Sequence, residues 1–156
     1  MNETLRSSGP GPKMFHLARF EHGVVVAQLD ETAADAARRL RDFRVGCVVV
    51  IRGDRSVGIL TDRDLALRVV AEGRDPRTTL VSEIVTYDAT TVPREAGIET
   101  AVRLMRDRGV RRLPIVTEDG QVTGIVTADD LMILLSDELA QVGTAIRDNV
   151  DASESR

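Results

Sequence analysis

The sequence predicts a mixed α/β (α+β) fold, built from two tandem β-α-β-β-α repeats that pack against each other through their sheets. The first observation is internal similarity, because residues 45–65 match residues 110–131. The second is that each copy carries helix-period and strand-period patterns in the same order. The third is that one small sheet with helices over one face buries little apolar surface, so a second copy is needed to share a core.

The composition limits both the core and the function. The chain has 156 residues, of which 42% are hydrophobic, 29% charged and 3% aromatic, with no Trp. This length is sufficient for one compact domain or two small intertwined ones, and the core must be aliphatic. With so few aromatic side chains and a net charge of −4, neither base stacking nor bulk positive charge supports a nucleic-acid partner.

The elements of the two repeats follow one order. In the first repeat we expect a β segment, a helix, two strands and a closing helix at residues 24–26, 32–44, 47–51, 57–60 and 62–70. Their counterparts in the second repeat are residues 90–92, 98–109, 113–116, 122–126 and 128–139. Gly and Asp between the paired strands indicate a hairpin. The offset between the copies is 65 residues before this turn and 66 after it, so the insertion lies in the turn, where insertions are tolerated.

Apolar residues at a spacing of 3.6 define the buried face that we expect for the first helix of each repeat. They are Ala33, Ala36, Ala37, Leu40 and Phe43 in the first repeat, and Ile98, Ala101, Val102 and Met105 in the second. Residues 72–88 join the repeats and include a short helical stretch near residues 81–84. The predicted boundaries are a disordered lead-in at 1–15, repeats at 16–78 and 79–140, and a helix end with a tail at 141–156.

Several classes of function find no support in the sequence. Cys47 lies alone in an apolar run, so we expect a buried small side chain and a reducing compartment, the cytoplasm. No apolar run approaches the ~20 residues that span a membrane. His16 and His22, with Glu21 nearby, lack a further cluster of ligands, so we expect no metal site. Without a nucleophile–base pattern or a phosphate-binding Gly-rich motif, we expect no enzymatic activity.

The repeats carry the motif of a known family. In the second repeat the matching residues are 110–116, Gly120, 124–127, Asp130 and Leu131. Most of the motif recurs at residues 45–65. The pattern resembles the CBS (cystathionine-β-synthase) domain pair, also called a Bateman module. Residues 61–64 and 73–76 resemble those of small stand-alone bacterial CBS-pair proteins, including the hypoxic-response type.

The resemblance implies a fold, an assembly and a class of ligand. The fold is an α/β module with pseudo-twofold symmetry, and the assembly is a homodimer in which two pairs form a flat disc of four repeats. The ligands are adenosine compounds such as AMP, ADP, ATP, S-adenosylmethionine or NAD-type molecules, bound in clefts between the repeats. No resident cofactor is required, because the adenylate acts as a regulatory ligand.

Two Thr-x-x-Asp pairs are the first candidates for ligand contact. Thr61 with Asp64, and Thr127 with Asp130, each stand where a strand ends and a helix begins. Free backbone N–H groups and the helix dipole favour phosphate there. The resemblance implies that Thr contacts phosphate and that Asp contacts the ribose. The alternative is a capping box, in which Thr and Asp only cap the helix; both interpretations stay open, and one does not exclude the other.

Arginines and a strand complete the candidate site of the second repeat. Arg111 and Arg112 precede the strand that begins Leu113-Pro114, and because neighbours in a strand point to opposite faces, we expect one of them in the cleft. Family resemblance favours phosphate contact; the alternative is a pair of exposed arginines. Pro114 suggests an edge strand, whose free backbone groups could meet the edge of adenine.

The first repeat departs from this pattern. Gly46-Cys47 replaces the arginine pair, and Val49 replaces the proline, with Val48 and Val49 at the equivalent place in the strand. The positive charge for a phosphate would have to come from Arg63 or Arg44. We therefore expect the site of the first repeat to bind a different ligand or none.

Two functions compete at this point. The first is a nucleotide-sensing module that changes the packing of its repeats on binding and passes the signal to an effector protein, since we see no effector domain in these residues. The second is a ligand-free dimeric scaffold that binds a partner through its helical faces. Neither requires a membrane or a nucleic acid.

Overall fold

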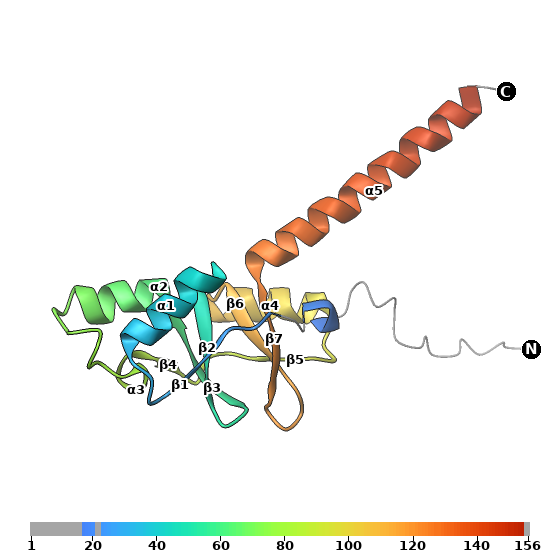
Figure 1. Cartoon of the computed structure of the whole chain (residues 1–156). Coiled ribbons are helices and arrows are strands. Elements are labelled where there is room, and N and C mark those ends of the chain that lie inside the picture. The colour runs from blue at the N-terminus through green and yellow to red at the C-terminus, as the bar shows by residue number, and fades with distance from the viewer. Residues whose placement is uncertain (1–16, 21–22, 155–156) are drawn as a thin grey trace, which may run out of the picture.

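The computed structural model describes residues 17–20 and 23–154 and confirms the mixed α/β fold (Figure 1). The first half contains η2 (Leu17–Phe20), β1 (Val26–Gln28), α1 (Ala33–Phe43), β2 (Cys47–Arg52), β3 (Arg55–Thr61), α2 (Asp62–Leu65) and the π-helix η3 (Ala66–Val70). It is followed by α3 (Val81–Ile84), β4 (Thr86–Tyr87), β5 (Val92–Pro93), α4 (Ile98–Arg108), β6 (Arg112–Val116), β7 (Val122–Thr127) and α5 (Ala128–Glu154).

The strand pairing shows that the two halves are structural copies. One sheet has the order β1-β2-β3-β4 and the other β5-β6-β7, and in both a parallel strand lies beside an antiparallel hairpin. The hairpins share an irregularity in register, at Val50/Ile51 in the first and at Ile115/Val116 in the second. The repeat that the sequence predicts is therefore confirmed down to the position of the bulge.

Each sheet buries one face against its own helices. In the first repeat the core contains Val48, Val50 and Leu60, together with the α1 residues Ala36 and Leu40. Because side chains alternate along a strand, Val49 and its neighbour Cys47 point to the opposite face, where both are also buried. The first sheet is thus covered on both faces at its centre, by helices on one side and by the other repeat on the other.

The second core repeats this plan with different side chains. It contains Leu113 and Ile115 from β6, Val126 from β7, and Ala101 and Met105 from α4. Pro114 stands between the two β6 core residues, points to the opposite face and is fully buried. The alternation is the same in both repeats, so their sheets present equivalent faces to one another.

The tips of the two hairpins are joined by hydrogen bonds. Arg55 and Gln121 form an isolated antiparallel bridge, and the Val122 amide donates to the Asp54 carbonyl at 3.1 Å. The Gln121 side chain also donates to the Asp54 carboxylate at 2.7 Å. The turn of the second hairpin, which is one residue longer than that of the first, takes part in this contact. The turn in which the two copies differ in length therefore also joins the two repeats.

The chain crosses between the repeats at both ends. Leu17 is fully buried in the second core, although it lies within the predicted first repeat of 16–78. In return, β4 pairs with β3 of the first sheet through Thr86 and Tyr87. A Cβ on Gly58 would lie 2.7 Å from a methyl group of Val85 and would also clash with the Thr86 carbonyl. The predicted boundary at 78 and 79 remains a prediction, while these contacts fasten each repeat to the other.

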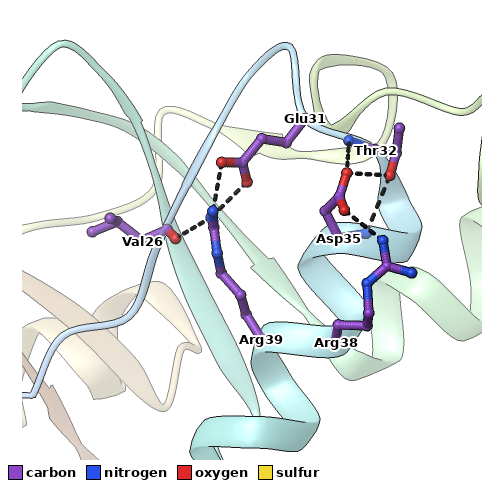
Figure 2. A network of polar contacts seen from close by, with 6 residues as sticks. All are labelled: Val26, Glu31, Thr32, Asp35, Arg38 and Arg39. Atoms are coloured by element: carbon purple, nitrogen blue, oxygen red, sulfur yellow. Dashed lines mark hydrogen bonds and ion pairs between the residues drawn. The ribbon is translucent and has the colours of Figure 1, made fainter.

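A side-chain network covers the edge of the first sheet. β1 is an edge strand, and Arg39 of α1 donates to the Val26 carbonyl at 2.6 Å (Figure 2). The same guanidinium forms a two-pronged ion pair with Glu31, at 2.5 and 2.6 Å. Because an uncovered edge offers unpaired backbone groups to other chains, this network protects the strand.

Helix α1 is closed at both ends. Thr32 and Asp35 form a capping box at its start, and hydrogen bonds from Thr32 and Arg38 lower the pKa of the Asp35 carboxyl. At its end Arg44 adopts a left-handed conformation with φ 54°. The equivalent residue of the second repeat, Gly109, has φ 63°, which costs a glycine far less.

Some expectations for single residues and bounds are wrong. Ala37 and Phe43 on α1 and Val102 on α4 are exposed. Each helix turns only a narrow stripe toward its sheet, and on α1 this stripe contains Ala33, Ala36 and Leu40. The β segments lie later than expected, at β1 and β5. The last helix continues without a break past residue 139 into the expected helix end, and it reaches Glu154, where a tail was expected.

Candidate functional site

A cleft of about 520 Å³ lies between the two repeats. One wall is apolar and comes from the first repeat, with Val24, Val25 and Val45. The other wall is polar and comes from the second repeat, with Arg111, Arg112, Thr127 and Asp130. The structure therefore brings four of the predicted site residues together, beside apolar residues that the sequence interpretation assigned only to a strand and a helix end.

Thr127 and Asp130 form a capping box at the start of α5. The Asp130 carboxylate accepts hydrogen bonds from the Thr127 amide at 2.9 Å and from its hydroxyl at 2.7 Å. The Thr127 hydroxyl in turn accepts from the Asp130 amide at 3.1 Å. The capping alternative therefore describes the ligand-free geometry. Both bonds to the carboxylate fall on Oδ2, so the capping box leaves Oδ1 unused.

The same box occurs at two other helix starts. Thr61 and Asp64 make it with distances of 2.9, 2.8 and 3.1 Å. Thr32 and Asp35 make it at the start of α1, away from the cleft. Because three helices share the motif, the capping geometry alone does not identify a ligand site. The residues around each capping box distinguish a possible ligand site from a simple helix cap.

The surroundings differ between the first and second repeats. Arg68 lies 3.4 Å from Asp64 Oδ1, and it also donates to the Ile84 carbonyl at 2.6 Å and to the Thr86 hydroxyl at 3.0 Å. The equivalent residue of the second repeat is Leu134, which is buried in its core. Asp130 therefore has no arginine in this place, whereas both oxygens of Asp64 are engaged within the first repeat.

The two arginines of the cleft lie at different depths. Arg111 has a side chain that is 75% exposed and forms an ion pair with Asp129 at 3.1 Å on the rim. Arg112 is partly buried, and a Cβ on Gly46 would lie 3.0 Å from its Nη2 atom. Within the described part of the chain the Arg112 guanidinium makes no hydrogen bond or ion pair. Asp62 Oδ2 lies 3.7 Å from the same Cβ position, so a carboxylate stands nearby without forming an ion pair with this partly buried positive charge.

Cys47 stands beside this charge. It is buried and lines the cleft, as expected for a small apolar side chain. Burial raises the pKa of its thiol, and the nearby Arg112 opposes that shift. The thiol is therefore protonated at neutral pH, and its place in the cleft wall is one of packing.

Three further predicted site residues are core side chains. Val48 and Leu113 lie in the two hydrophobic cores, and Pro114 is buried on the other face of β6. Their side chains do not line this cleft, so any contact with a ligand would be through the backbone, as the sequence interpretation proposed for the strand.

The expected edge position of Pro114 is wrong, because β6 is the inner strand of its sheet. The reason is visible in the first repeat, where the Val49 amide donates to the Val25 carbonyl at 2.9 Å. Pro114 has no amide hydrogen to make the equivalent bond. Pairing of β5 with β6 therefore begins one residue later, at Ile115.

The remaining predicted residues lie apart from this cleft. Thr61, Arg63 and Asp64 stand at the start of α2, and Arg63 is exposed. Arg44, the other candidate for phosphate charge, is exposed at the end of α1. Residues that sequence reasoning missed include Phe20 and Asp129, which line the cleft. No local pattern marks them, because they reach the cleft only through the fold.

The described residues supply no metal centre and no membrane span. In residues 17–20 and 23–154, no three His, Cys, Asp or Glu side chains are grouped to hold a metal ion. His16, Glu21 and His22 lie outside the described residues. Over the same part of the chain, no helix has the length and apolar character needed to cross a bilayer.

Comparison with known proteins agrees with the repeat and its cleft. The family model of the CBS domain matches residues 20–71 and 81–137. The chain belongs to the CBS domain family. The two matched segments are the two CBS repeats, and the resemblance drawn from the motifs is confirmed.

Relatives include a hypoxic response protein and a CBS domain-containing protein. The chain is 33% identical over 110 residues to hypoxic response protein 1 of Mycobacterium tuberculosis, covering 70% of this chain and 76% of that one. It is 37% identical over 110 residues to the uncharacterized protein MK0525 of Methanopyrus kandleri, covering 70% of this chain. The match spans 56% of the length of MK0525 and 22% of CBSCBSPB3 of Arabidopsis thaliana.

Solved structures share the CBS-pair fold. The crystal structure of hypoxic response protein I with two coordinated zinc ions has a TM-score of 0.67 and 30% identity, covering 75% of this chain and 96% of that one. PAE2072 from Pyrobaculum aerophilum, complexed with AMP, has a TM-score of 0.68 and 23% identity, covering 78% and 98%. At that identity PAE2072 supports the fold alone.

Proposed function

We propose that this CBS pair is a regulatory module that binds an adenosine phosphate in the cleft beside Thr127. The observation that carries the proposal is Arg112, a partly buried guanidinium that makes no hydrogen bond or ion pair with a described residue. An anion is the natural partner for such a charge, and a phosphate can accept two hydrogen bonds from one guanidinium.

The walls of the cleft suggest how the rest of the nucleotide is held. The phosphate lies between Arg112 and the first turn of α5, where Thr127 adds a hydroxyl and the helix dipole favours negative charge. The ribose hydroxyls donate to Asp130 Oδ1, which the capping box leaves free. The adenine ring lies against the apolar wall of Val24 and Val25.

This arrangement does not require the helix cap to break. Asp130 uses Oδ2 for the cap, and a carboxylate has further lone pairs for two ribose hydroxyls. The volume of about 520 Å³ is also within the range of small-molecule pockets, roughly 300–1,000 Å³. The site is thus shaped in advance and gains its neutralising charge on binding.

The first repeat is proposed to be the weaker or empty site. Arg68 already neutralises Asp64, and Gly46 stands where the second repeat has Arg111. Thr61 and Asp64 then serve mainly to cap α2, and Arg63 lies exposed on its surface. A ligand there would have to displace the Arg68 contact.

Binding produces a signal only if the ligand prefers one arrangement of the repeats. The cleft has one wall from each repeat, so an adenylate that contacts both walls favours the arrangement in which the two repeats lie close together. We propose that a homodimer of CBS pairs passes this change to an effector protein, and that the role is regulatory rather than catalytic. A cytoplasmic location remains a prediction from the single cysteine.

Two solved relatives bear on the choice of ligand. PAE2072 is complexed with AMP, and the CBS pair of MJ0100 is in complex with 5′-methylthioadenosine and S-adenosyl-L-methionine. Both are CBS pairs, so adenosine compounds are the first panel to test. The unpartnered arginine favours the phosphorylated members of that panel.

Thermal unfolding with a ligand panel tests the proposal. We expect AMP, ADP or ATP to raise the stability by about 2.7 kcal/mol at a concentration of 100 times the dissociation constant. GMP is the matched control for the base and adenosine for the phosphate. If no adenosine compound shifts the transition of the folded protein, the competing function, a ligand-free dimeric scaffold, takes its place.

A further inference from the structure

The last helix extends well beyond the body of the protein. α5 has 27 residues, which corresponds to about 40 Å. Leu131 and Leu134 are its buried residues in the second core, and Ala128 packs against that core. The following stretch, from Leu135 to Glu154, is roughly 30 Å long and projects away from the other elements (Figure 1). Half or more of the helix therefore has no packing partner within the described chain.

A regular apolar seam runs along this helix. Its residues follow the alternating spacing of three and four that defines the contact line of a coiled coil. They are Met132, Leu135, Leu139, Val142 and Ile146, whose exposed fractions are 64%, 46%, 73%, 56% and 59%. Isolated apolar residues on a surface are ordinary, but five in this register form one continuous stripe.

The projecting helix has little to stabilise it alone. Most of the stability of a helix in a protein comes from packing of its apolar face rather than from helix propensity, and Gly143 in its interior costs about 1 kcal/mol relative to Ala. No ion pair joins two residues of α5 in its described part. A helix of this kind is stable when its apolar stripe is covered.

The residues beside the seam favour a second identical helix. The flanking positions carry Ser136, Gly143 and Ala145, with Glu138 as the one charged residue. Small, uncharged flanks allow two copies to approach without repulsion between like charges. A basic partner would need acidic groups along the seam, but Asp137 and Asp148 lie on the outer face of the same heptad pattern.

The length of the helix favours a parallel orientation of the pair. In an antiparallel pair the two kinds of seam position face each other, so Leu139 would meet Val142 and Glu154 would lie opposite Thr127. Thr127 is where α5 leaves the body, so each helix end would reach the body of the other copy. In a parallel pair every seam residue meets its own counterpart, and both bodies lie at the same end.

We propose that α5 forms a parallel two-stranded coiled coil with α5 of a second copy of this chain. The contact is separate from the cleft and does not depend on the proposed nucleotide site. It joins two CBS pairs at their C-terminal ends, in addition to any contact between their bodies.

Cysteine cross-linking tests the contact locally. Val142→Cys is made in a Cys47→Ser background, and the full chain is oxidised under mild conditions. Thr144→Cys is the control, because two residues turn a helix by about 200° and carry the thiol to the opposite side. We expect the cysteine at 142 to form a covalent dimer at least tenfold faster than the one at 144. Equal rates, or no cross-link at either position, would overturn the proposal.

A second comparison separates the seam from contacts elsewhere. In the Val142→Cys protein, Leu139→Glu with Ile146→Glu should slow cross-linking at least tenfold. Gln141→Glu with Thr144→Glu adds the same charge to the outer face and should leave the rate unchanged. All four positions are exposed, so neither pair should alter folding. If the two pairs behave alike, the helices do not meet along this seam, whatever the adenylate panel shows.

Discussion

Arg68 lies 3.4 Å from the carboxylate of Asp64 and occupies the group that the first repeat would otherwise present to a ligand. In the second repeat Leu134 takes the place of this arginine, and Asp130 keeps one oxygen free. The two repeats share a fold and a motif, and this substitution, together with Gly46-Cys47 in place of Arg111-Arg112, makes them chemically unequal. The predictions on ligand binding follow from that inequality.

Replacement of the two acids, Asp130 and Asp64, should have unequal effects on AMP binding. Asp130→Asn should weaken AMP binding about 10–100-fold, since a hydrogen bond to a charged group contributes about 1.5–3 kcal/mol. Asp64→Asn should leave the affinity within about twofold, because Arg68 already engages that carboxylate. Isothermal titration of both variants measures the difference. The site assignment fails if the two losses are equal.

Arg112 should act on the phosphate and not on the nucleoside. We expect Arg112→Met to lower the affinity for AMP about 10–100-fold, because a charge-assisted hydrogen bond is lost. The affinity for adenosine, measured by the same titration, should stay the same. Arg63→Met is the matched control, an exposed arginine of the first repeat, and should change neither affinity. An equal loss for AMP and adenosine would mean that the variant had only distorted the cleft.

Gly58 should not tolerate a side chain. The added methyl of Gly58→Ala would overlap Val85 and the backbone of β4, so we expect a loss of at least about 2 kcal/mol in the free energy of unfolding. Gly143→Ala is the control, because only an arginine side-chain end lies near its Cβ position, at 3.9 Å, and it should stabilise the helix by about 0.5–1 kcal/mol. Urea denaturation gives both values. A neutral Gly58→Ala would show that β4 can move away from β3.

Arg39 should protect the β1 edge (Figure 2). Removal of its charge by Arg39→Met leaves Glu31 and the Val26 carbonyl without this donor, which should cost about 1 kcal/mol. It should also increase light scattering on storage, since an uncovered edge strand pairs with other chains. Arg38→Met, on an exposed ion pair of the same helix, should leave both unfolding and scattering unchanged. Equal behaviour of the two variants would remove the protective role.

Arg44→Gly should stabilise the protein by about 0.5–1 kcal/mol. The residue is left-handed at φ 54°, a conformation that costs a residue with a Cβ roughly 1–2 kcal/mol, from which the greater freedom of glycine in the unfolded chain must be subtracted. The second repeat already has glycine there, at Gly109. Arg103→Gly, in the exposed interior of α4, should do the reverse and cost about 1 kcal/mol. Thermal unfolding distinguishes the two signs.

The sequence predicted most of the fold because its signals are local. The strands Cys47–Arg52 and Val122–Thr127 and the helix Ile98–Arg108 lie within a residue or two of the expected ranges. Hydrophobic period and turn residues report directly on such elements. The signals were weaker for β1 and β5, which are short and were placed too early, and they gave no indication of η2 or β4.

The candidate site was only partly predictable for the opposite reason. The Thr-x-x-Asp spacing identified Thr127 and Asp130, but also Thr61 and Asp64, and a third copy at Thr32 and Asp35 only caps a helix. Spacing in sequence does not report which arginine will approach which acid. Arg68 reaches Asp64 while it is held by Ile84 and Thr86 on the other side.

By itself, then, the sequence determined that this protein is a pair of CBS repeats with a Thr-x-x-Asp turn and an arginine pair in the second. The tertiary structure decided that the apolar Val24 and Val25 lie across a cleft from Arg112, and that the acid of the first repeat is already neutralised. Periodicity and capping depend on residues within one or two turns. The two walls of the cleft come from segments almost ninety residues apart, and only the packed fold brings them together.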